Sequence, residues 1–442
     1  MKTASKYFFV VLLAVSLFAL NYCIERANFP WLISLVTIAG GAYFFMLFKT
    51  VFSKKEILLV AIGIRALFLF SIPNLSDDYF RFAWDGQMIV EGENPYLILP
   101  EKHIDTDQSD YLRELYEGMN SKRYFTVYPP FNQAVFAASA YLGQQSISLT
   151  IFWMKFFLLL SEILMLFIIF QLLKRLKLAE HLAIIYAFNP LVIVEIVGNI
   201  HFEGMMLMFM FLSVLLLIQN RLFLAGIAMA LAINTKLIPF MLLPLFISYL
   251  GFQKSLGYFM IIGGAILLMF VPFVSHELIA NFGSSIDLYF QNFEFNASIY
   301  YLIRWVGFQI TGYNVIKIVG YILPVLVLGT ILIQSLKGKK ENITQLFASM
   351  TSVLTVYYLV ASIVHPWYVI NLVVLSVFTK RYYLLVWSVT IFLSYFAYSN
   401  YIQENGLTKH TSSWYFALVA VEYMLVALAF ILEKNNKLKI KI

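Results

Sequence analysis

Long apolar runs alternate with short polar connections along the whole chain. A helix that crosses a bilayer core needs about 20 mostly apolar residues, and the length and periodicity of these runs predict a polytopic membrane bundle. Several runs are short enough to be half-helices that line a cavity, so twelve to fourteen transmembrane helices are expected. The expected helices cover residues 7–23, 31–49, 56–73, 148–173, 181–199, 203–218, 222–235, 237–250, 256–274, 316–336, 344–364, 366–378, 382–398 and 414–432.

Two long segments, residues 74–147 and 275–315, separate the predicted helices. Within the first, "YPPFNQAVFAASAYLG" is too short and too polar to span a bilayer, so it predicts a helix lying at the outer surface. The first 23 residues resemble a signal peptide, but no small-x-small cleavage site follows, which favours a retained helix. We therefore predict an all-α fold with one membrane domain over residues 1–442.

Composition supports an integral membrane protein. The chain is 61% hydrophobic and 12% charged, whereas about a quarter of residues are charged in soluble domains. Its mean hydropathy is +0.80. Cys23 is the one cysteine of the sequence, which excludes an internal disulfide and any multi-cysteine metal site.

Charge is distributed unevenly between the two sides of the predicted bundle. With the N-terminus inside, the inner connections and ends hold 19 of the 31 Lys and Arg but 4 of the 24 Asp and Glu. Because short basic connections face the cytoplasm, the net charge of +7 is a topology signal, and no nucleic-acid partner is predicted. Besides Lys2 and Lys6, the inner segments are 49–56, 174–180, 219–221, 251–255, 337–343, 379–381 and the tail from Glu433.

An acidic, aromatic-rich segment, "NLSDDYFRFAWDGQMIVEGENPY", follows the third predicted helix. Asp77 and Asp78 are expected on an irregular stretch at the outer membrane boundary. There, desolvation and mutual repulsion would raise the pKa of one carboxyl toward the range of a general base. The alternative is a solvated helix cap, in which Asp77 or Asp78 accepts backbone N–H bonds.

Other polar residues are predicted at the same outer side. "GNIHFEG" places His201 and Glu203 in a turn between two helices, "NTKLIP" places Lys236 at a helix end, and "VHPWY" places His365 before a proline. Ionisable groups within a membrane usually face a cavity or one another. Lys155 and Glu162 are expected on one helix face, either as a structural ion pair or as functional groups.

No metal motif is evident. The histidines lack HExxH-like spacing, so a zinc hydrolase is not expected. Asp77, Asp78 and Glu203 carry oxygen ligands of the kind that hard divalent cations prefer, and a divalent cation is left open as a cofactor.

The order of "DDYFRFAWDG", "EGENPY", "YPPFNQ", "FWMKFFLLLSE", "NPLVIVEIVGNIHFEG", "NTKLIPFMLLP" and "HPWYVI" resembles the GT-C class of integral membrane glycosyltransferases. Within that class it is similar to bacterial polyprenyl-phosphate-mannose-dependent mannosyltransferases and, more distantly, to GPI mannosyltransferase I. The resemblance covers residues 60 to 380. It implies inverting transfer of one sugar, mannose by resemblance alone, from a polyprenyl-phosphate donor to a glycan or lipid acceptor. The site would face the outer, periplasmic side of the inner membrane.

The resemblance also implies roles for particular residues. The carboxylate before Tyr79 matches the family's Asp-Tyr position, so Asp78 is the first choice of base and Asp77 the second. Many family members carry this motif after the first helix, whereas here it follows the third. Cations must hold the departing phosphate, and Lys236, His365 and Arg81 are the candidates. Further substrate-binding candidates are Trp84, Asp85, Asn94, Tyr128, Asn199, His201 and Glu203.

Two rival functions are weighed against this one. A transporter or flippase would explain charges expected toward the membrane midplane, such as Glu162 and Glu195, but it predicts inverted repeats, and none is visible in the sequence. A lipid-dependent ligase would need a large outer loop with basic residues late in the chain, whereas the sequence of residues 275–315 contains Arg304 as its one Lys or Arg.

Overall fold

The computed structural model describes residues 3–105, 109–291, 293–338, 340 and 342–435. Every regular element in these residues is a helix, and their one β-type pairing is an isolated parallel bridge between Phe295 and Ile363. The all-α prediction is confirmed. The chain divides into two compact units. Unit 1 comprises Met1–Leu67, Ile169–Glu195 and Phe293–Ile442, and unit 2 comprises Phe68–Ile168 and Ile196–Asn292.

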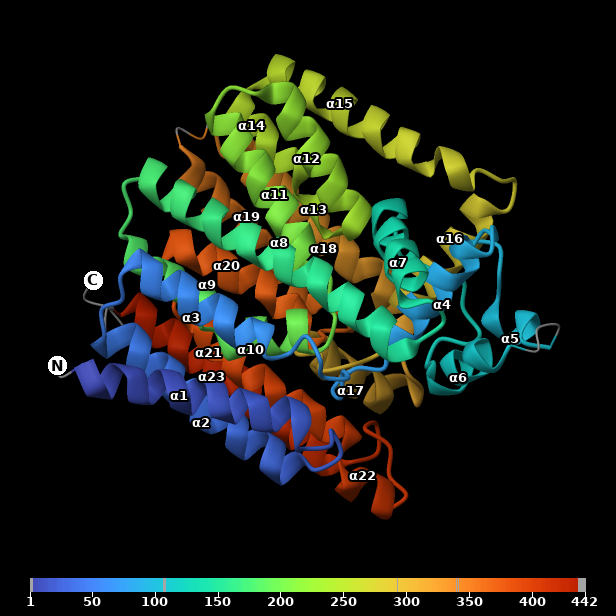
Figure 1. The fold of residues 1–442 in the computed structure, drawn as a ribbon. Coiled ribbons are helices and arrows are strands. Elements are labelled where there is room, and N and C mark those ends of the chain that lie inside the picture. Colours follow the sequence, from blue (N-terminus) through green and yellow to red (C-terminus); the bar gives the residue numbers. More distant parts are fainter. Residues whose placement is uncertain (1–2, 106–108, 292, 339, 341, 436–442) are drawn as a thin grey trace. The chain divides into compact units, whose positions relative to one another are not determined.

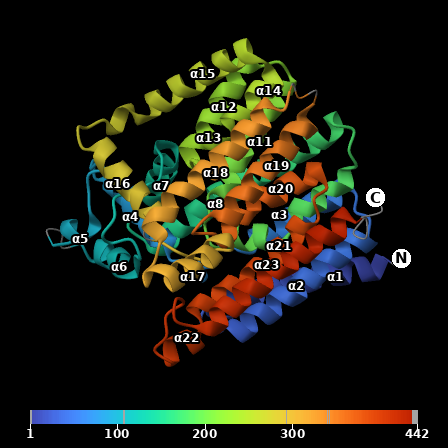
Figure 2. The ribbon, with the colours of Figure 1, turned by 180° about the vertical axis from the view of Figure 1, so that it is seen from behind.

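Unit 1 contains α1 (Thr3–Tyr22), α2 (Phe29–Lys49), α3 (Lys54–Ala66), α9 (Ile184–Ala187), α10 (Pro190–Ile193), α17 (Ile299–Thr311), α18 (Ile316–Leu336), α19 (Ile343–Val360), α20 (Ile370–Thr379), α21 (Tyr383–Thr390), α22 (Asn400–Glu404) and α23 (Ser413–Lys434). Figure 1 shows α1 and α2 running side by side, and Figure 2 shows α23 alongside α21.

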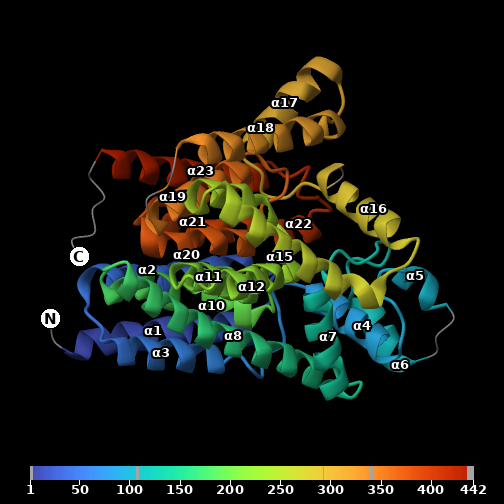
Figure 3. The same cartoon turned by 90° about the horizontal axis from the view of Figure 1, so that it is seen from above.

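Unit 2 contains α4 (Asp78–Val90), α5 (Pro100–His103), α6 (Asp110–Gly118), α7 (Pro130–Gly143), α11 (Glu203–Ile218), α12 (Leu222–Thr235), α13 (Ile238–Leu242), α14 (Ile247–Leu250), α15 (Phe252–Phe270) and α16 (Leu278–Gln291). The long helix α8 (Ile147–Arg175) begins in unit 2, and its last residues belong to unit 1. Figure 3 shows α4, α5, α6 and α7 gathered together.

Among the described residues, seven helices are long and apolar enough to cross a membrane, namely α1, α2, α8, α15, α18, α19 and α23. An eighth candidate span is broken, because Glu180–Ala187 and Pro190–Gly198 meet at 57°. Asn189 caps the second half by accepting from the backbone N–H groups of Leu191 and Val192. The chain is thus a multi-pass membrane protein. The expected twelve to fourteen spans had included shorter apolar helices, such as α11 and α12. These helices are too short to cross a bilayer core on their own.

The helices of unit 2 that follow the broken span pack through small residues. On α12, Ala225, Gly226 and Ala228 are buried, and a Cβ at Gly226 would lie 2.6 Å from the side chain of Ile261 on α15. Small residues allow membrane helices to approach closely. The Ser213 hydroxyl of α11 also donates to the Ala225 carbonyl at 2.7 Å. α12 therefore lies close against α15, and the Ser213 bond joins it to α11.

Two local predictions are wrong. The third helix ends at Ala66 and not at residue 73, and Asp78 begins the helix α4 where an irregular stretch was expected. Residues 275–315, predicted as an outer loop, contain α16 and α17. The helix predicted within residues 128–143 is confirmed as α7. It packs on α4, and its buried side includes Gln133, Phe136 and Ala140.

Gly86 sets the spacing between α4 and α7. A Cβ at this position would lie 2.4 Å from the Phe136 carbonyl oxygen and 3.1 Å from the Ala137 backbone nitrogen. Backbone atoms cannot move aside as a flexible side chain can. We therefore expect Gly86→Ala to force the helices apart and to destabilise unit 2 by about 1–3 kcal/mol, the usual range for overpacking.

Thermal unfolding of the detergent-purified protein tests this expectation. The matched control is Gly263→Ala on α15, where a Cβ would meet nothing within 4 Å. Gly86→Ala should lower the unfolding temperature, and Gly263→Ala should leave it unchanged or raise it, because alanine favours helices. Equal unfolding temperatures for the two variants would contradict the close packing of α4 on α7.

Candidate active site

The N-terminal end of α4 presents the acidic pair. Asp77 precedes the helix without capping it through its side chain, and Asp78 is its first residue. Asn120 donates to Asp78 Oδ1 at 3.2 Å, and the Asp78 backbone N–H donates to Ser76 Oγ at 3.3 Å. Both carboxylates are half-buried. Asp78 is therefore oriented by neighbours and still reaches solvent.

A buried ion pair lies at the end of the α11–α12 hairpin. Glu203, the first residue of α11, is fully buried, and its Oε1 accepts from the Nζ of Lys236, which directly follows α12. The Lys236 side chain is 17% exposed. Asp78 is close enough to Glu203 for their like charges to interact. Unit 2 thus brings together Asp78, Glu203 and Lys236, which are far apart in the sequence.

The turn before α11 is tied to the segment before α4. Asn199 is fully buried, and its Oδ1 accepts from the Leu75 backbone N–H at 3.1 Å. Ile200 has a φ of +60°, which costs a β-branched residue about 1–3 kcal/mol. His201 is also buried. Strain of this kind persists where the surroundings fix the backbone, so we infer that this turn positions the acidic pair.

Glu162 of α8 approaches the first turn of α11. A Cβ at Gly204 would lie 2.6 Å from Glu162 Oε1, so a glycine is required for this carboxylate to lie there. Lys155 donates from Nζ to the Phe68 carbonyl at 3.1 Å and to the Ser71 carbonyl and hydroxyl at 2.7 Å each. These three bonds use all the N–H donors of an ammonium group. Lys155 therefore binds the segment after α3, not Glu162.

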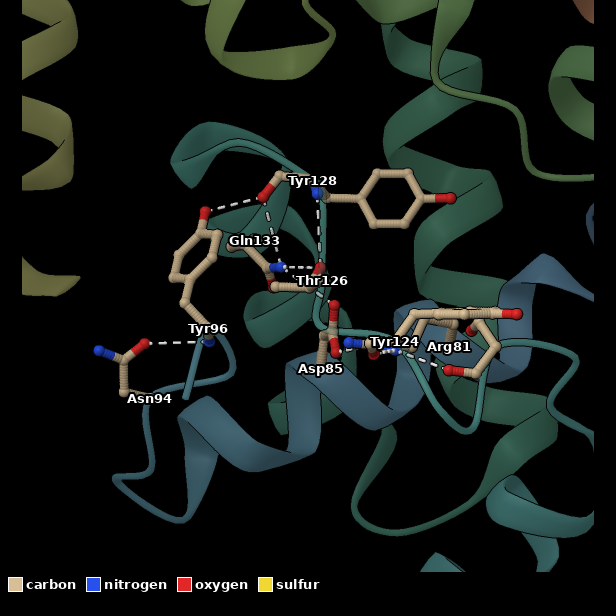
Figure 4. Close-up of polar contacts among 9 residues, drawn as sticks. Arg81, Asp85, Asn94, Tyr96, Tyr124, Thr126, Tyr128 and Gln133 are labelled. Atoms are coloured by element: carbon tan, nitrogen blue, oxygen red, sulfur yellow. Dashed lines mark hydrogen bonds and ion pairs between the residues drawn. The ribbon is translucent and has the colours of Figure 1, made fainter. Parts of the chain in front are cut away.

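Arg81 and Asp85 form the centre of a buried network, shown in Figure 4. The two residues are one helical turn apart, and Arg81 Nε lies 2.7 Å from Asp85 Oδ1. Arg81 Nη1 also donates to the carbonyls of Ser121 and Tyr124. Gln133 Nε2 donates to the second Asp85 oxygen at 3.0 Å and to Thr126 Oγ1 at 2.9 Å. The network joins α4, α7 and the segment between α6 and α7.

Tyr128 and Asn94 belong to the neighbouring part of this network. The Tyr128 carbonyl accepts from the Tyr96 hydroxyl at 2.7 Å, and Asn94 Oδ1 accepts from the Tyr96 backbone N–H at 3.1 Å (Figure 4). Burial raises the pKa of Tyr96, with a smaller effect from Asp85, so this hydroxyl stays protonated and donates. Asn94 also donates to the Phe273 carbonyl at 3.1 Å. These bonds order the chain around α4.

Trp84 is buried in the core of unit 2 and is 1% exposed. Its ring packs edge-on against His103, with a centroid distance of 5.8 Å. Stacking on a sugar requires an exposed ring face, and Trp84 presents almost none.

His365 is the one predicted site residue that belongs to unit 1. It is half-buried and its ring stacks on Phe295 at 4.8 Å and on Trp367 at 4.4 Å. The bridge between Phe295 and Ile363 brings these two chain segments together.

No group of three or more His, Cys, Asp or Glu side chains gathers in the described residues as a metal site. Asp77, Asp78 and Glu203 therefore do not form an assembled cation site in this structure.

The residues of these networks that sequence reasoning missed include Gln133, Asn120 and Tyr96. Gln133 carried a signal, since it is a polar residue in an otherwise apolar helix and buried polar groups need partners. Asn120 and Tyr96 carried none, because their contacts come from chain segments brought together by folding.

A comparison with protein families matches residues 29–251 to the MptA/B family, described as alpha-(1->6)-mannopyranosyltransferase, N-terminal domain. No curated protein and no solved structure matches the chain. The match spans half of the chain and contains Asp78, Glu203 and Lys236. It confirms the resemblance to membrane mannosyltransferases that the order of motifs had indicated. This multi-pass membrane protein therefore belongs to the alpha-(1->6)-mannopyranosyltransferase family and is a glycosyltransferase.

Proposed function

We propose that the protein transfers mannose from a polyprenyl-phosphate donor to an acceptor hydroxyl with inversion at the anomeric carbon. The observation that carries this proposal is the grouping of Asp78, Glu203 and Lys236 in unit 2. Displacement of a phosphate needs a base for the incoming hydroxyl and a cation for the departing oxygen. The half-buried Asp78 carboxylate can supply the base, and Lys236 can supply the cation.

The proposed step is a single displacement. The acceptor oxygen forms a bond to C1 of mannose while the bond from C1 to the phosphate oxygen breaks. The hydroxyl proton passes to Asp78, and the electron pair leaves on the phosphate, whose charge Lys236 stabilises. One inversion gives an α-linked product only from a β-linked donor, and the family description specifies an α-(1→6) product.

The proposed site lies at the outer face of the membrane. A polyprenyl chain must stay in lipid while its phosphate reaches the headgroup level. We take the basic connections 49–56 and 174–180 as cytoplasmic, so that α3 and α8 both cross the membrane and the Asp78 segment lies outside. The acceptor is then a glycan or lipid-linked glycan whose mannose presents a free 6-hydroxyl.

The remaining predicted residues take supporting roles in this proposal. Arg81 and Asp85 are buried and bound to each other, so we assign them to holding α4. Asn199 positions the preceding segment through its bond to Leu75, His201 is buried beside it in the chain, and Trp84 packs the core. Contact of Asn94, Tyr128 and His365 with substrate stays a prediction from the sequence.

A transfer assay with the purified protein tests the proposal. The donors are β-linked and α-linked polyprenyl-phosphate mannose, the β-linked glucose analogue and a nucleotide-linked mannose. The acceptors are a mannoside and its 6-deoxy analogue. We expect transfer from the β-linked mannose donor alone, to the mannoside alone. Transfer from the nucleotide-linked donor, or to the 6-deoxy acceptor, would overturn the proposal. Parallel reactions with a chelator establish whether a divalent cation takes part.

A further inference from the structure

Two buried charged side chains of α8 take no part in the proposed reaction. Lys155 and Glu162 are both fully buried, and they lie seven residues apart in the part of α8 that belongs to unit 2. Seven residues are close to two helical turns, so both side chains lie on one face of the helix, about 10 Å apart along its axis. Charged groups inside a membrane protein are costly, and they usually serve a function.

Lys155 holds the segment that leads to the proposed base. Residues 67–77 join α3 to α4 through turns and bends, so their path depends on tertiary contacts. Three hydrogen bonds from the Lys155 ammonium group end on this segment, two of them on Ser71, seven residues before Asp78. Asn199 binds the same segment nearer to Asp78. Lys155 and Asn199 therefore fix the approach of the chain to Asp78.

Glu162 lies against the start of α11. A Cβ at Gly204 would lie 2.6 Å from Glu162 Oε1, so this carboxylate meets the first turn of the helix. The residue before α11 is Phe202, whose apolar ring offers no acceptor for the first backbone N–H groups. The first turn is the positive end of the helix dipole, and a carboxylate there stabilises it. The same turn carries Glu203, which binds Lys236.

The two side chains thus reach different segments from one helix. Lys155 holds the chain before Asp78. Glu162 meets the helix start that carries Glu203, the partner of Lys236. Because a helix is rigid over two turns, the separation of Lys155 and Glu162 along α8 fixes the separation of the two segments that they hold.

We propose that Lys155 and Glu162 are positioning residues, which set the distance between the base Asp78 and the phosphate-binding Lys236. This inference rests on the proposed function, because that function gives Asp78 and Lys236 their roles. Displacement at C1 of the sugar needs the acceptor oxygen and the departing phosphate on opposite sides of the carbon, at a fixed separation. A misplacement of about 1 Å can cost about 100-fold in rate. Neither α8 side chain contacts substrate, and each acts through the segment that it holds.

Steady-state kinetics of substituted proteins separate the two ends of this stretch of α8. Lys155→Met keeps the length of the side chain and removes its donors, so kcat should fall about 10- to 100-fold while the donor KM changes less than about twofold. Glu162→Gln removes the charge at the start of α11, so the donor KM should rise about three- to tenfold with a smaller change in kcat. Leu160→Met, on the exposed side of α8, is the matched control and should match the wild type.

Ser71→Ala guards against a folding defect in Lys155→Met, because it removes only one of the three bonds that Lys155 donates. It should lower kcat in the same way but by less, about three- to tenfold, with the donor KM unchanged. Wild-type kinetics in both variants would show that Lys155 does not position the base.

Double variants show whether each residue acts through its proposed partner. Lys155→Met should lower kcat less than about threefold in an Asp78→Asn background, because that background no longer has a base to position. Glu162→Gln should likewise leave the donor KM unchanged in a Lys236→Ala background. A purely structural role predicts the same loss in the wild-type and substituted backgrounds, and that result would overturn the assignment.

Hydrogen exchange without substrate tests the positioning directly. Lys155→Met should speed the exchange of backbone amides in residues 67–77 at least about threefold and leave the start of α11 unchanged. Glu162→Gln should do the reverse. Faster exchange throughout unit 2 in either variant, or wild-type exchange in both segments, would contradict the proposal.

The proposed function and the positioning by α8 fail in different ways. If the exchange changes occur as expected and the wild type transfers no mannose from polyprenyl-phosphate mannose, the positioning of the two segments stands and the proposed function fails. If the wild type transfers mannose and the α8 variants match it in kinetics and in exchange, only the positioning fails.

Discussion

Asp78→Asn is expected to lower mannosyl transfer by at least about a hundredfold, because a positioned general base contributes on the order of 10² to 10⁴ in rate. An asparagine oxygen can still accept the hydrogen bond that Asn120 donates to Asp78 Oδ1. The local structure should therefore survive, and the loss should appear in kcat. Initial rates are measured at saturating donor and acceptor, with membrane expression and unfolding temperature recorded beside them.

Asp110→Asn is the matched control, because Asp110 is also the first residue of a helix in unit 2 and is exposed. It should retain full activity. Asp77→Asn separates the two members of the acidic pair. A hundredfold loss in Asp77→Asn with near-normal turnover in Asp78→Asn would transfer the role of base to Asp77. Near-normal turnover in both variants would remove this pair from the mechanism.

Lys236→Ala is expected to raise the KM for the donor about 10- to 100-fold, with a smaller effect on the KM for the acceptor. Hydrogen bonds to charged groups contribute about 1.5–3 kcal/mol, which corresponds to that range. The variant also leaves the fully buried Glu203 without its partner, which typically costs about 3–5 kcal/mol of stability. Steady-state kinetics with each substrate varied in turn measure the first effect, and thermal unfolding measures the second.

The Glu203→Gln, Lys236→Met double variant separates these two effects. Removing both charges should recover most of the lost stability, since no buried carboxylate remains unpaired. The weak binding of the donor should persist. Lys254→Ala, at an exposed position near the start of α15, is the matched control and should match the wild type. A defect confined to the acceptor, or a donor KM restored in the double variant, would refute a phosphate-binding role for Lys236.

The apolar segments of the bundle were predicted closely from the sequence. Residues 203–218, 222–235 and 316–336 were expected as helices, and α11, α12 and α18 have these bounds. Long apolar runs flanked by polar residues leave few alternatives in a membrane, where backbone groups must bond within the helix.

The helix α4 was missed for a physical reason. It mixes acidic, aromatic and glycine residues, so its sequence shows no continuous apolar run. Its stability comes from tertiary contacts, including the close approach of Gly86 to α7 and the bond from Gln133 to Asp85. The Arg81–Asp85 spacing was the one local signal, since residues four apart face each other on a helix.

The sequence predicted which residues belong to the candidate site, but not which of their side chains contact one another. Glu203 and Lys236 were both expected at helix ends on one side, yet their ion pair depends on the packing of α11 against α12. For Lys155 the expected pair is not formed. Its expected partner, Glu162, lies on the same helix, whereas its three hydrogen bonds go to Phe68 and Ser71, more than eighty residues away in the sequence. The spacing of residues along a helix identifies which side chains share a helix face, but not which other segment packs against that face.

The alternation of the two units along the chain has a consequence for biogenesis. The last residue of unit 2 is Asn292, so all segments of this unit are available once the ribosome has passed that point. Unit 1 begins at the N-terminus but needs residues 293–442 for its completion. Of its first three helices, α2 packs on α21, so this contact forms only after part of residues 293–442 has been made. A nascent chain stalled after residue 292 would contain every segment of unit 2, which carries Asp78, together with an incomplete unit 1.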